Sequence, residues 1–170
     1  AVCLSPLCIV TEFVENGSLE KYLHKKSFTL NELINFLRDI SAGMSHLAAE
    51  GVVHKDLAAR NVLVTSTGSA KIADFGLARN YEEKHYSVQA IGPLRWMSPE
   101  NLLKKEFSEK SDVWSFAATA VEIFTKKIPY PAMDTIVVTR EVMNGALKPE
   151  IPSQVQTKDD LSEVPEKLLE

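Results

Sequence analysis

Two short polar stretches hold the side chains of this chain that are best suited to chemistry. Asp56, Arg60 and Asn61 lie within one stretch, and Asp74 opens the second. Carboxylate and carboxamide oxygens are ligands that a hard cation such as Mg²⁺ prefers, and a guanidinium compensates phosphate charge. A carboxylate can also accept the proton of a hydroxyl that attacks a phosphate. This set of groups predicts the handling of magnesium and a nucleotide phosphate.

The sequence around the first stretch predicts a long helix before it and a β-hairpin after it. Thr29-Leu30-Asn31-Glu32 is a capping-box pattern, and apolar residues then recur at helical spacing until Leu47, shortly before Gly51. Val62–Val64 and Ala70–Ala73 are two strand-like runs around a turn-rich connector. The chemical groups are therefore expected on the loop between the helix and the hairpin.

The rest of the chain predicts one more strand and mostly helices. A strand is expected over residues 8–14, and helices are expected over 18–26, 112–124, 135–144 and 164–170. Residues 77–92 are expected to form a long loop and residues 148–160 to be irregular.

Composition excludes several classes of protein. The net charge of −4 argues against a nucleic-acid binder, which usually carries a basic surplus. No apolar run is long enough to span a bilayer, and the N-terminus lacks the basic start of a signal peptide. Cys3 and Cys8 are expected to be small apolar residues and not a disulfide. Because the chain begins without Met and stops inside a helix-like stretch, we expect it to be a fragment.

In this context the two polar stretches resemble motifs of protein kinases. His54–Asn61 is similar to the catalytic loop H-R-D-L-x-x-x-N, and Asp74-Phe75-Gly76 matches the D-F-G element. A lone Asp-Phe-Gly is more often a turn, but two motifs in this order are far more specific than either alone. The resemblance implies an α+β, protein-kinase-like fold with a mainly helical C-terminal lobe and a small hairpin. Residues 1–14 would be the last strand of the N-terminal lobe with the hinge, and residues 15–170 a C-terminal lobe truncated before its final helices.

The resemblance implies a role for each chemical group. Asp56 would accept the proton of the acceptor hydroxyl, Arg60 would compensate charge, and Asn61 and Asp74 would bind the metal. ATP would be the phosphate donor, with Mg²⁺, or Mn²⁺ in its place, on the phosphates.

Further residues would bind the nucleotide. Thr11 resembles the gatekeeper, and the backbones of Glu12 and Val14 would meet the adenine edge. Leu63 matches the apolar floor beneath the adenine, and Ala73 precedes the D-F-G element. Without the resemblance, Thr11, Leu63 and Ala73 would each be ordinary core residues.

Two segments resemble tyrosine kinases in particular. Serine/threonine kinases usually place a Lys two residues after the catalytic Asp, where this chain has Ala58 followed by Ala59-Arg60. Pro93-Leu94-Arg95-Trp96 resembles the platform for a tyrosine acceptor, and Trp96–Glu100 the segment that closes the activation loop. Asp112 would tie down the backbone of the catalytic loop.

These segments imply a cytoplasmic signalling enzyme that phosphorylates tyrosines of protein substrates, without nucleic-acid or membrane contact. Tyr86 is the expected regulatory phosphorylation site, with Tyr81 the weaker candidate. A serine/threonine or dual-specificity enzyme is one alternative, and a pseudokinase that acts as a binding scaffold is another.

The chain departs from the kinase pattern in a few places. Lys55 stands where the family usually has Arg, which predicts weaker phosphate-dependent switching because lysine lacks the bidentate fork. Ala117 replaces a Gly in the buried helix, and the segment between Tyr86 and Pro93 is slightly short. The Gly-rich phosphate loop, the strand lysine and the partner glutamate would lie upstream of this chain. We therefore expect the parent protein to be a kinase and this polypeptide alone to be inactive.

Overall fold

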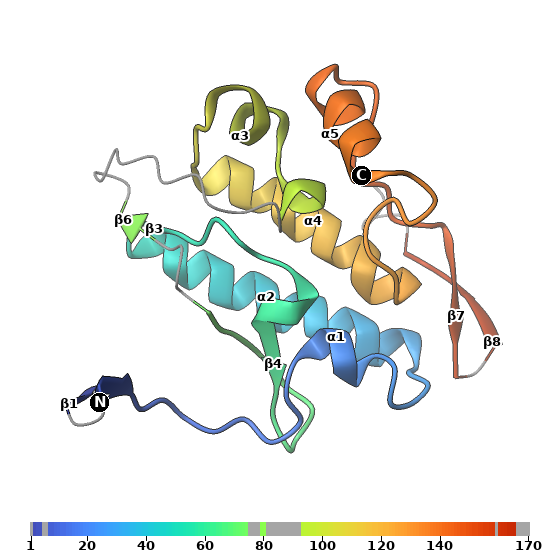
Figure 1. The fold of residues 1–170 in the computed structure, drawn as a ribbon. Coiled ribbons are helices and arrows are strands. Elements are labelled where there is room, and N and C mark those ends of the chain that lie inside the picture. The colour runs from blue at the N-terminus through green and yellow to red at the C-terminus, as the bar shows by residue number, and fades with distance from the viewer. Residues whose placement is uncertain (1, 5–6, 75–78, 81–92, 159, 166–170) are drawn as a thin grey trace.

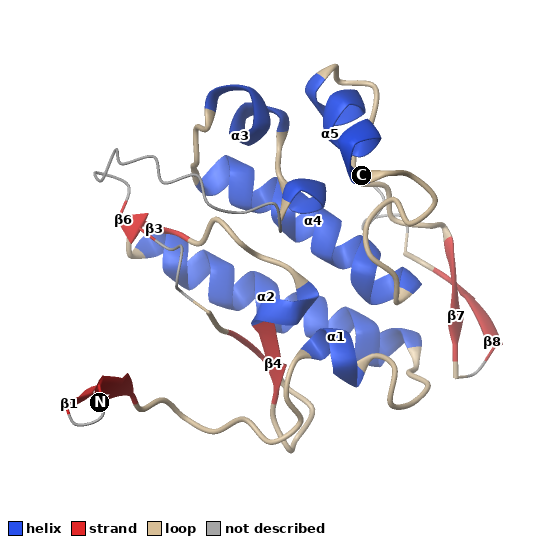
Figure 2. Ribbon diagram, in the orientation of Figure 1, coloured by secondary structure: helices blue, strands red, loops and turns tan. Residues whose placement is uncertain are grey.

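Two long helices, α2 (Leu30–Ala49) and α4 (Glu109–Thr125), pack against each other at the centre of the fold (Figure 1). The computed structural model describes residues 2–4, 7–74, 79–80, 93–158 and 160–165. Within these residues, short antiparallel hairpins surround the helices (Figure 2). The architecture is α+β, mainly helical with small hairpins, as the sequence predicts.

Helix α2 begins and ends at the expected signals. The Thr29 hydroxyl accepts a hydrogen bond from the Glu32 N–H at 3.2 Å, and the Glu32 carboxylate accepts one from the Thr29 N–H at 2.8 Å. This capping box satisfies backbone donors that the first turn leaves unpaired. Gly51 adopts φ +67°, a conformation that glycine reaches without strain, just beyond the end of the helix.

The predicted hairpin follows the catalytic-loop segment. Strand β4 (Val62–Val64) pairs antiparallel with β5 (Ala70–Ile72), with Leu63 opposite Lys71. Strand β5 packs on α2 so closely that a Cβ at Gly43 would lie 2.8 Å from the Ile72 Cδ1. The long helix therefore supports the hairpin directly behind the site.

One apolar core joins α2, α4 and the hairpin. Its innermost side chains are fully buried: Leu19, Leu33, Ile40, Leu57, Val62, Val64 and Ile123. Tyr22, Phe28 and Phe36 extend this core with ring centroids 5.6–6.3 Å apart. Burial of this surface anchors both ends of the catalytic loop.

Four short helical segments complete the described helices. They are α1 (Leu19–Tyr22), η1 (Ala59–Asn61), η2 (Leu94–Trp96) and α3 (Pro99–Lys104), and α5 (Thr135–Met143) is the remaining longer helix. Helix α1 is shorter than the expected 18–26. Helix α3 was not predicted, although Ser98 caps its N-terminus and Pro99 occupies its first turn, which are ordinary start signals.

The expectation of irregular structure over 148–160 was wrong. Strand β7 (Gln154–Thr157) pairs with β8 (Asp160–Glu163) as a hairpin. Val155 and Thr157 alternate with exposed glutamines and are buried, which is the period-2 pattern of a half-buried strand. A helix was also expected over 164–170. Val164 and Pro165 are not helical, and residues 166–170 lie outside the described part.

The N-terminal strand is shorter than expected. Strand β2 (Leu7–Ile9) pairs with β1 (Val2–Leu4), whereas residues 10–14 form a non-strand segment that leads into the helical body (Figure 1). Strand β3 (Val52–Val53) pairs with β6 (Arg79–Asn80) inside the expected 77–92 loop. The rest of that loop lies outside the described residues.

Candidate active site

Helix α4 holds the backbone of the catalytic-loop segment in place. The Asp112 carboxylate accepts hydrogen bonds from the backbone N–H groups of His54, at 2.7 Å, and Lys55, at 3.0 Å. Lys55 has φ 72°, in the left-handed region that a residue with a Cβ rarely adopts. Burial raises the pKa of Asp112, while these two hydrogen bonds oppose that rise. The expected contact of Asp112 with the loop is present.

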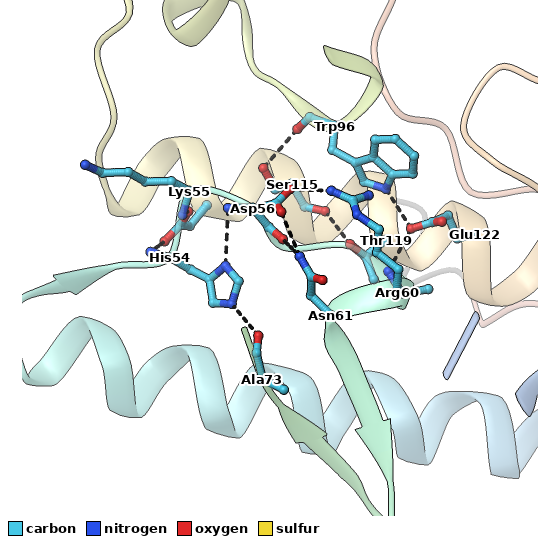
Figure 3. A network of polar contacts seen from close by, with 12 residues as sticks. His54, Lys55, Asp56, Arg60, Asn61, Ala73, Trp96, Ser115, Thr119 and Glu122 are labelled. Atoms are coloured by element: carbon cyan, nitrogen blue, oxygen red, sulfur yellow. Dashed lines mark hydrogen bonds and ion pairs between the residues drawn. The ribbon is translucent and has the colours of Figure 1, made fainter. Parts of the chain in front are cut away.

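The buried His54 ring connects the loop to the strand that leads to Asp74 (Figure 3). Its Nδ1 accepts a hydrogen bond from the Asp56 N–H at 3.2 Å, so its Nε2 carries the proton that the Ala73 carbonyl accepts at 3.2 Å. The Ala73 N–H in turn donates to the Asn61 carbonyl at 2.9 Å. The two polar stretches of the sequence are thus joined into one site.

The carboxylate of Asp56 is held by two neighbours. The Arg60 guanidinium forms an ion pair with Asp56 Oδ1, and the Asn61 Nδ2 donates to Asp56 Oδ2 at 2.8 Å and to its backbone carbonyl at 2.7 Å. Arg60 also lies over the Trp96 ring, 4.8 Å from the centroid. The Asp56 carboxylate is therefore oriented from two sides (Figure 3).

The residues expected to bind metal have suitable donor chemistry. Because the Asn61 nitrogen is engaged by Asp56, its amide oxygen points away from that carboxylate (Figure 3). Asp74 is exposed immediately after Ala73. Mg²⁺ is commonly bound by one or two protein oxygens together with phosphate oxygens and waters. The oxygens of Asn61 and Asp74 fit such an ion.

A buried glutamate that the sequence did not single out joins the loop to the expected acceptor platform. Glu122 Oε2 accepts hydrogen bonds from the Ala59 N–H at 3.0 Å and from the Trp96 Nε1–H at 2.6 Å. Burial raises the pKa of Glu122 to about 7, against the lowering effect of both hydrogen bonds and of Arg60, and nearby Glu20 raises it further. Its signal in the sequence is a single acidic residue inside the apolar run of residues 116–124.

We predict that Glu122→Gln changes how stability depends on pH. A folded-state pKa of about 7, above the ordinary 4.5, favours the native state most below pH 4.5, and this contribution is lost as pH rises through 7. The shift corresponds to on the order of 3 kcal/mol. Glutamine keeps an acceptor for both N–H groups but does not ionise, so the variant should gain stability relative to the wild type between pH 5 and pH 8. Urea unfolding of the parent protein at both pH values measures this difference.

Glu50→Gln, at an exposed position after α2, is the control. Its difference from the wild type should stay within about 0.5 kcal/mol at both pH values. If Glu122→Gln differed from the wild type equally at pH 5 and pH 8, the buried carboxyl would not titrate in this range.

Two of the residues expected around the nucleotide are tied to the β4–β5 hairpin: Leu63 belongs to β4, and Glu12 contacts β5. Thr11 and Glu12 are exposed, and Leu63 is half-buried in β4. Val14 is half-buried, and Glu12 pairs with Lys71 of β5 at 2.7 and 2.8 Å. The Asn16 Nδ2 donates to the Thr65 carbonyl at 2.7 Å and the Glu15 carboxylate accepts from the Ser66 N–H at 3.0 Å. These contacts fasten the expected hinge to the hairpin, and the nucleotide roles remain predictions.

The expected platform, Pro93–Trp96, lies against α4. Segment η2 places the Trp96 indole on Glu122, and the Ser115 hydroxyl donates to the Trp96 carbonyl at 2.9 Å (Figure 3). Tyr81 and Tyr86, the expected regulatory sites, lie outside the described residues.

Comparison with known proteins agrees with this geometry. A family described as "Protein tyrosine and serine/threonine kinase" matches residues 1–164. The chain belongs to this protein kinase family. It is 42% identical over 151 residues to the tyrosine-protein kinase TXK of Homo sapiens, which is 85% of this chain and 29% of that protein.

The names of two further relatives of this chain carry both substrate classes. The serine/threonine-protein kinase STY46 of Arabidopsis thaliana is 38% identical, over 99% of this chain and 30% of that protein. The tyrosine-protein kinase SRK3 of Spongilla lacustris is 40% identical, over 88% of this chain and 47% of that protein. The chain thus spans less than half the length of each of these kinases. Among the residues described here, no helix is long and apolar enough to cross a membrane.

Proposed function

We propose that the protein carrying this chain is a cytoplasmic signalling kinase that transfers the γ-phosphate of ATP to tyrosine hydroxyls of protein substrates. The observation that supports this most directly is the carboxylate of Asp56, oriented by Arg60 and Asn61 on a loop that Asp112 fixes. In this proposal residues 1–14 contribute the last N-lobe strand and the hinge, and residues 15–170 most of the C-terminal lobe.

Each polar residue of the site would have a separate role in phosphoryl transfer. Asp56 would align the acceptor hydroxyl and accept its proton, and the ion pair with Arg60 would hold the carboxylate in that orientation. Asn61 and Asp74 would hold Mg²⁺, which when bound would neutralise charge on the phosphates of ATP. The His54 ring is hydrogen-bonded both to Asp56 and to Ala73, the residue before Asp74. It would therefore fix the position of the proton acceptor relative to the metal ligand.

Two features support tyrosine as the acceptor. Ala58, at the place where serine/threonine kinases usually carry Lys, is fully buried and brings no charge to the site. Arg60 instead lies between Asp56 and the Trp96 ring, so one cation contacts both the catalytic loop and the platform. A phenol reaches further than a serine hydroxyl, so a tyrosine kinase needs a different support beneath the substrate backbone.

Serine/threonine transfer is the second candidate, because the relative named STY46 is a serine/threonine-protein kinase and matches nearly the whole chain. Phosphoamino-acid analysis distinguishes the two. The full-length parent should be incubated with ATP, Mg²⁺ and peptide libraries that differ only in a central Tyr, Ser or Thr. We expect phosphotyrosine to dominate. A product dominated by phosphoserine would assign the second function, and no product from any library would favour a pseudokinase scaffold.

A further inference from the structure

The side chain of Arg95 is bonded to a loop that lies far from it in the sequence. Its Nη1 donates to the carbonyls of Pro129, at 2.9 Å, and Tyr130, at 2.8 Å, and its Nη2 donates to the Met133 carbonyl at 2.7 Å. Its Nε donates to the Thr135 hydroxyl at 3.0 Å. One half-buried guanidinium therefore holds most of the connection between α4 and α5.

This connection contains a strained residue. Tyr130 has φ 55°, which is unfavourable for a residue with a Cβ, and its buried hydroxyl has no hydrogen-bond partner within the described part of the chain. Burial raises its pKa to about 12. Such a conformation persists only where the surroundings determine it. The carbonyls that Arg95 binds belong to Tyr130 and its neighbours, so Arg95 helps to maintain this conformation, together with the Met133 N–H that donates to the Tyr130 carbonyl at 3.1 Å.

The other side of η2 is fixed independently of Arg95. The Trp96 indole donates a hydrogen bond to Glu122, and the backbone carbonyl of Trp96 accepts one from Ser115. Both partners lie on α4. The platform is therefore attached to α4 on one side and, through Arg95, to residues 129–135 on the other. Charge-assisted hydrogen bonds of this kind are stronger than neutral ones, and only the guanidinium fork reaches four acceptors at once.

We infer that Arg95 is a positioning residue for the acceptor: it fixes the Pro93–Trp96 platform against residues 129–135 and so governs acceptor binding without contacting the acceptor. The inference rests on the proposed function, because it takes Pro93–Trp96 as the platform. It differs from a direct substrate role for Arg95, since four of its five N–H groups donate to acceptors within the chain. It also differs from a nucleotide role, since η2 packs on α4 and α5.

The test is a comparison of Arg95→Ala, Arg95→Lys and Thr135→Val in the full-length parent, with the peptide that the wild type phosphorylates best, whichever hydroxyl it carries. We expect Arg95→Ala to raise the KM for the peptide about tenfold, with the KM for ATP and kcat changed less than about threefold. Arg95→Lys keeps the charge but makes fewer hydrogen bonds, so its KM for the peptide should lie between those of the wild type and Arg95→Ala. Thr135→Val removes one acceptor only and should raise the peptide KM about twofold.

Arg140→Ala is the matched control, because Arg140 is an exposed arginine of α5 whose guanidinium pairs with its sequence neighbour Glu141. It should leave all three constants unchanged. Hydrogen exchange of the same proteins provides a readout that needs no catalysis: Arg95→Ala should speed exchange of the amides of 94–97 and 130–133 together. A fall in kcat with an unchanged peptide KM, or exchange that changes in neither segment, would overturn the inference. If Arg95→Ala does not fold, the same criteria apply to Arg95→Lys and Thr135→Val.

A wild-type parent without activity on any acceptor would refute the proposed function. The exchange experiment would still decide whether Arg95 couples the two segments. The two failures are therefore distinguishable.

Discussion

Asp56→Asn is expected to abolish phosphoryl transfer by the parent kinase while leaving ATP binding nearly intact. A carboxamide cannot accept the proton of the acceptor hydroxyl, and the loss of a positioned base typically reduces the rate about 10²–10⁴-fold. The asparagine oxygen can still accept one of the two hydrogen bonds now donated by Arg60 and Asn61, so the loop should stay folded. Single-turnover transfer to the preferred peptide measures the first effect, and fluorescence titration with an ATP analogue measures the second.

Asp134→Asn is the matched control, since it makes the same chemical change at the N-cap of α5. There the side chain accepts a hydrogen bond from the Ile136 N–H at 2.8 Å, and asparagine caps helices about as well as aspartate. Its activity should equal that of the wild type. If the Asp56 and Asp134 variants were equally active, the role assigned to Asp56 would be wrong. If Asp56→Asn lost ATP binding as well, its effect would not be specific to proton transfer.

Local patterns were sufficient to predict the elements that carry the site. The capping box at Thr29, the apolar spacing that follows it and the Val62–Val64 strand depend on neighbours in the sequence, and the structure confirms all three. The hairpin over 154–163 was missed because its strands are short and polar on one face. Their alternation becomes clear only when Val155 and Val164 are known to enter the core.

In the site too, residues within one motif could be predicted from the sequence, whereas contacts between distant segments required the structure. Motif spacing indicated which residues should carry chemistry, and these roles remain predictions. The resemblance added Asp112, which does hold the loop. The structure was needed for Glu122, for the two hydrogen bonds of the His54 ring and for the loop contacts of Arg95. Apart from the short-range hydrogen bond between Asp56 and the His54 ring, these contacts join positions far apart in the sequence, and no spacing rule relates them.

Asp112→Ala is expected to destabilise the domain and to inactivate it, and the loop geometry explains why the two effects are linked. Removal of the carboxylate takes away the acceptor that it supplies to the N–H groups of the buried His54 and the half-buried Lys55, at about 1–3 kcal/mol for each. Loss of the hydrogen bond to Asp112 also removes one of the contacts that hold Lys55 at its φ of 72°, a conformation that itself costs about 1–2 kcal/mol. Relaxation of Lys55 would move Asp56, the next residue, and a displacement of about 1 Å can reduce a rate about 10²-fold.

Asp112→Asn separates the two effects. Burial raises the pKa of Asp112, so replacing the carboxylate removes the cost of burying a charge and partly offsets the lost hydrogen bond. One of the two N–H groups would nevertheless face the carboxamide nitrogen. We therefore expect a change in the free energy of unfolding of less than about 2 kcal/mol, but a fall in kcat of at least about tenfold.

Glu109→Gln provides the control for Asp112→Asn, because it removes a carboxylate from an exposed position in the same first turn of α4. Loss of its favourable interaction with the helix dipole should cost less than about 1 kcal/mol and leave kcat unchanged. Urea unfolding and steady-state kinetics of the parent, measured on the same preparations, test these predictions. Full activity of Asp112→Asn would show that one hydrogen bond from this side chain suffices to hold the left-handed backbone before Asp56.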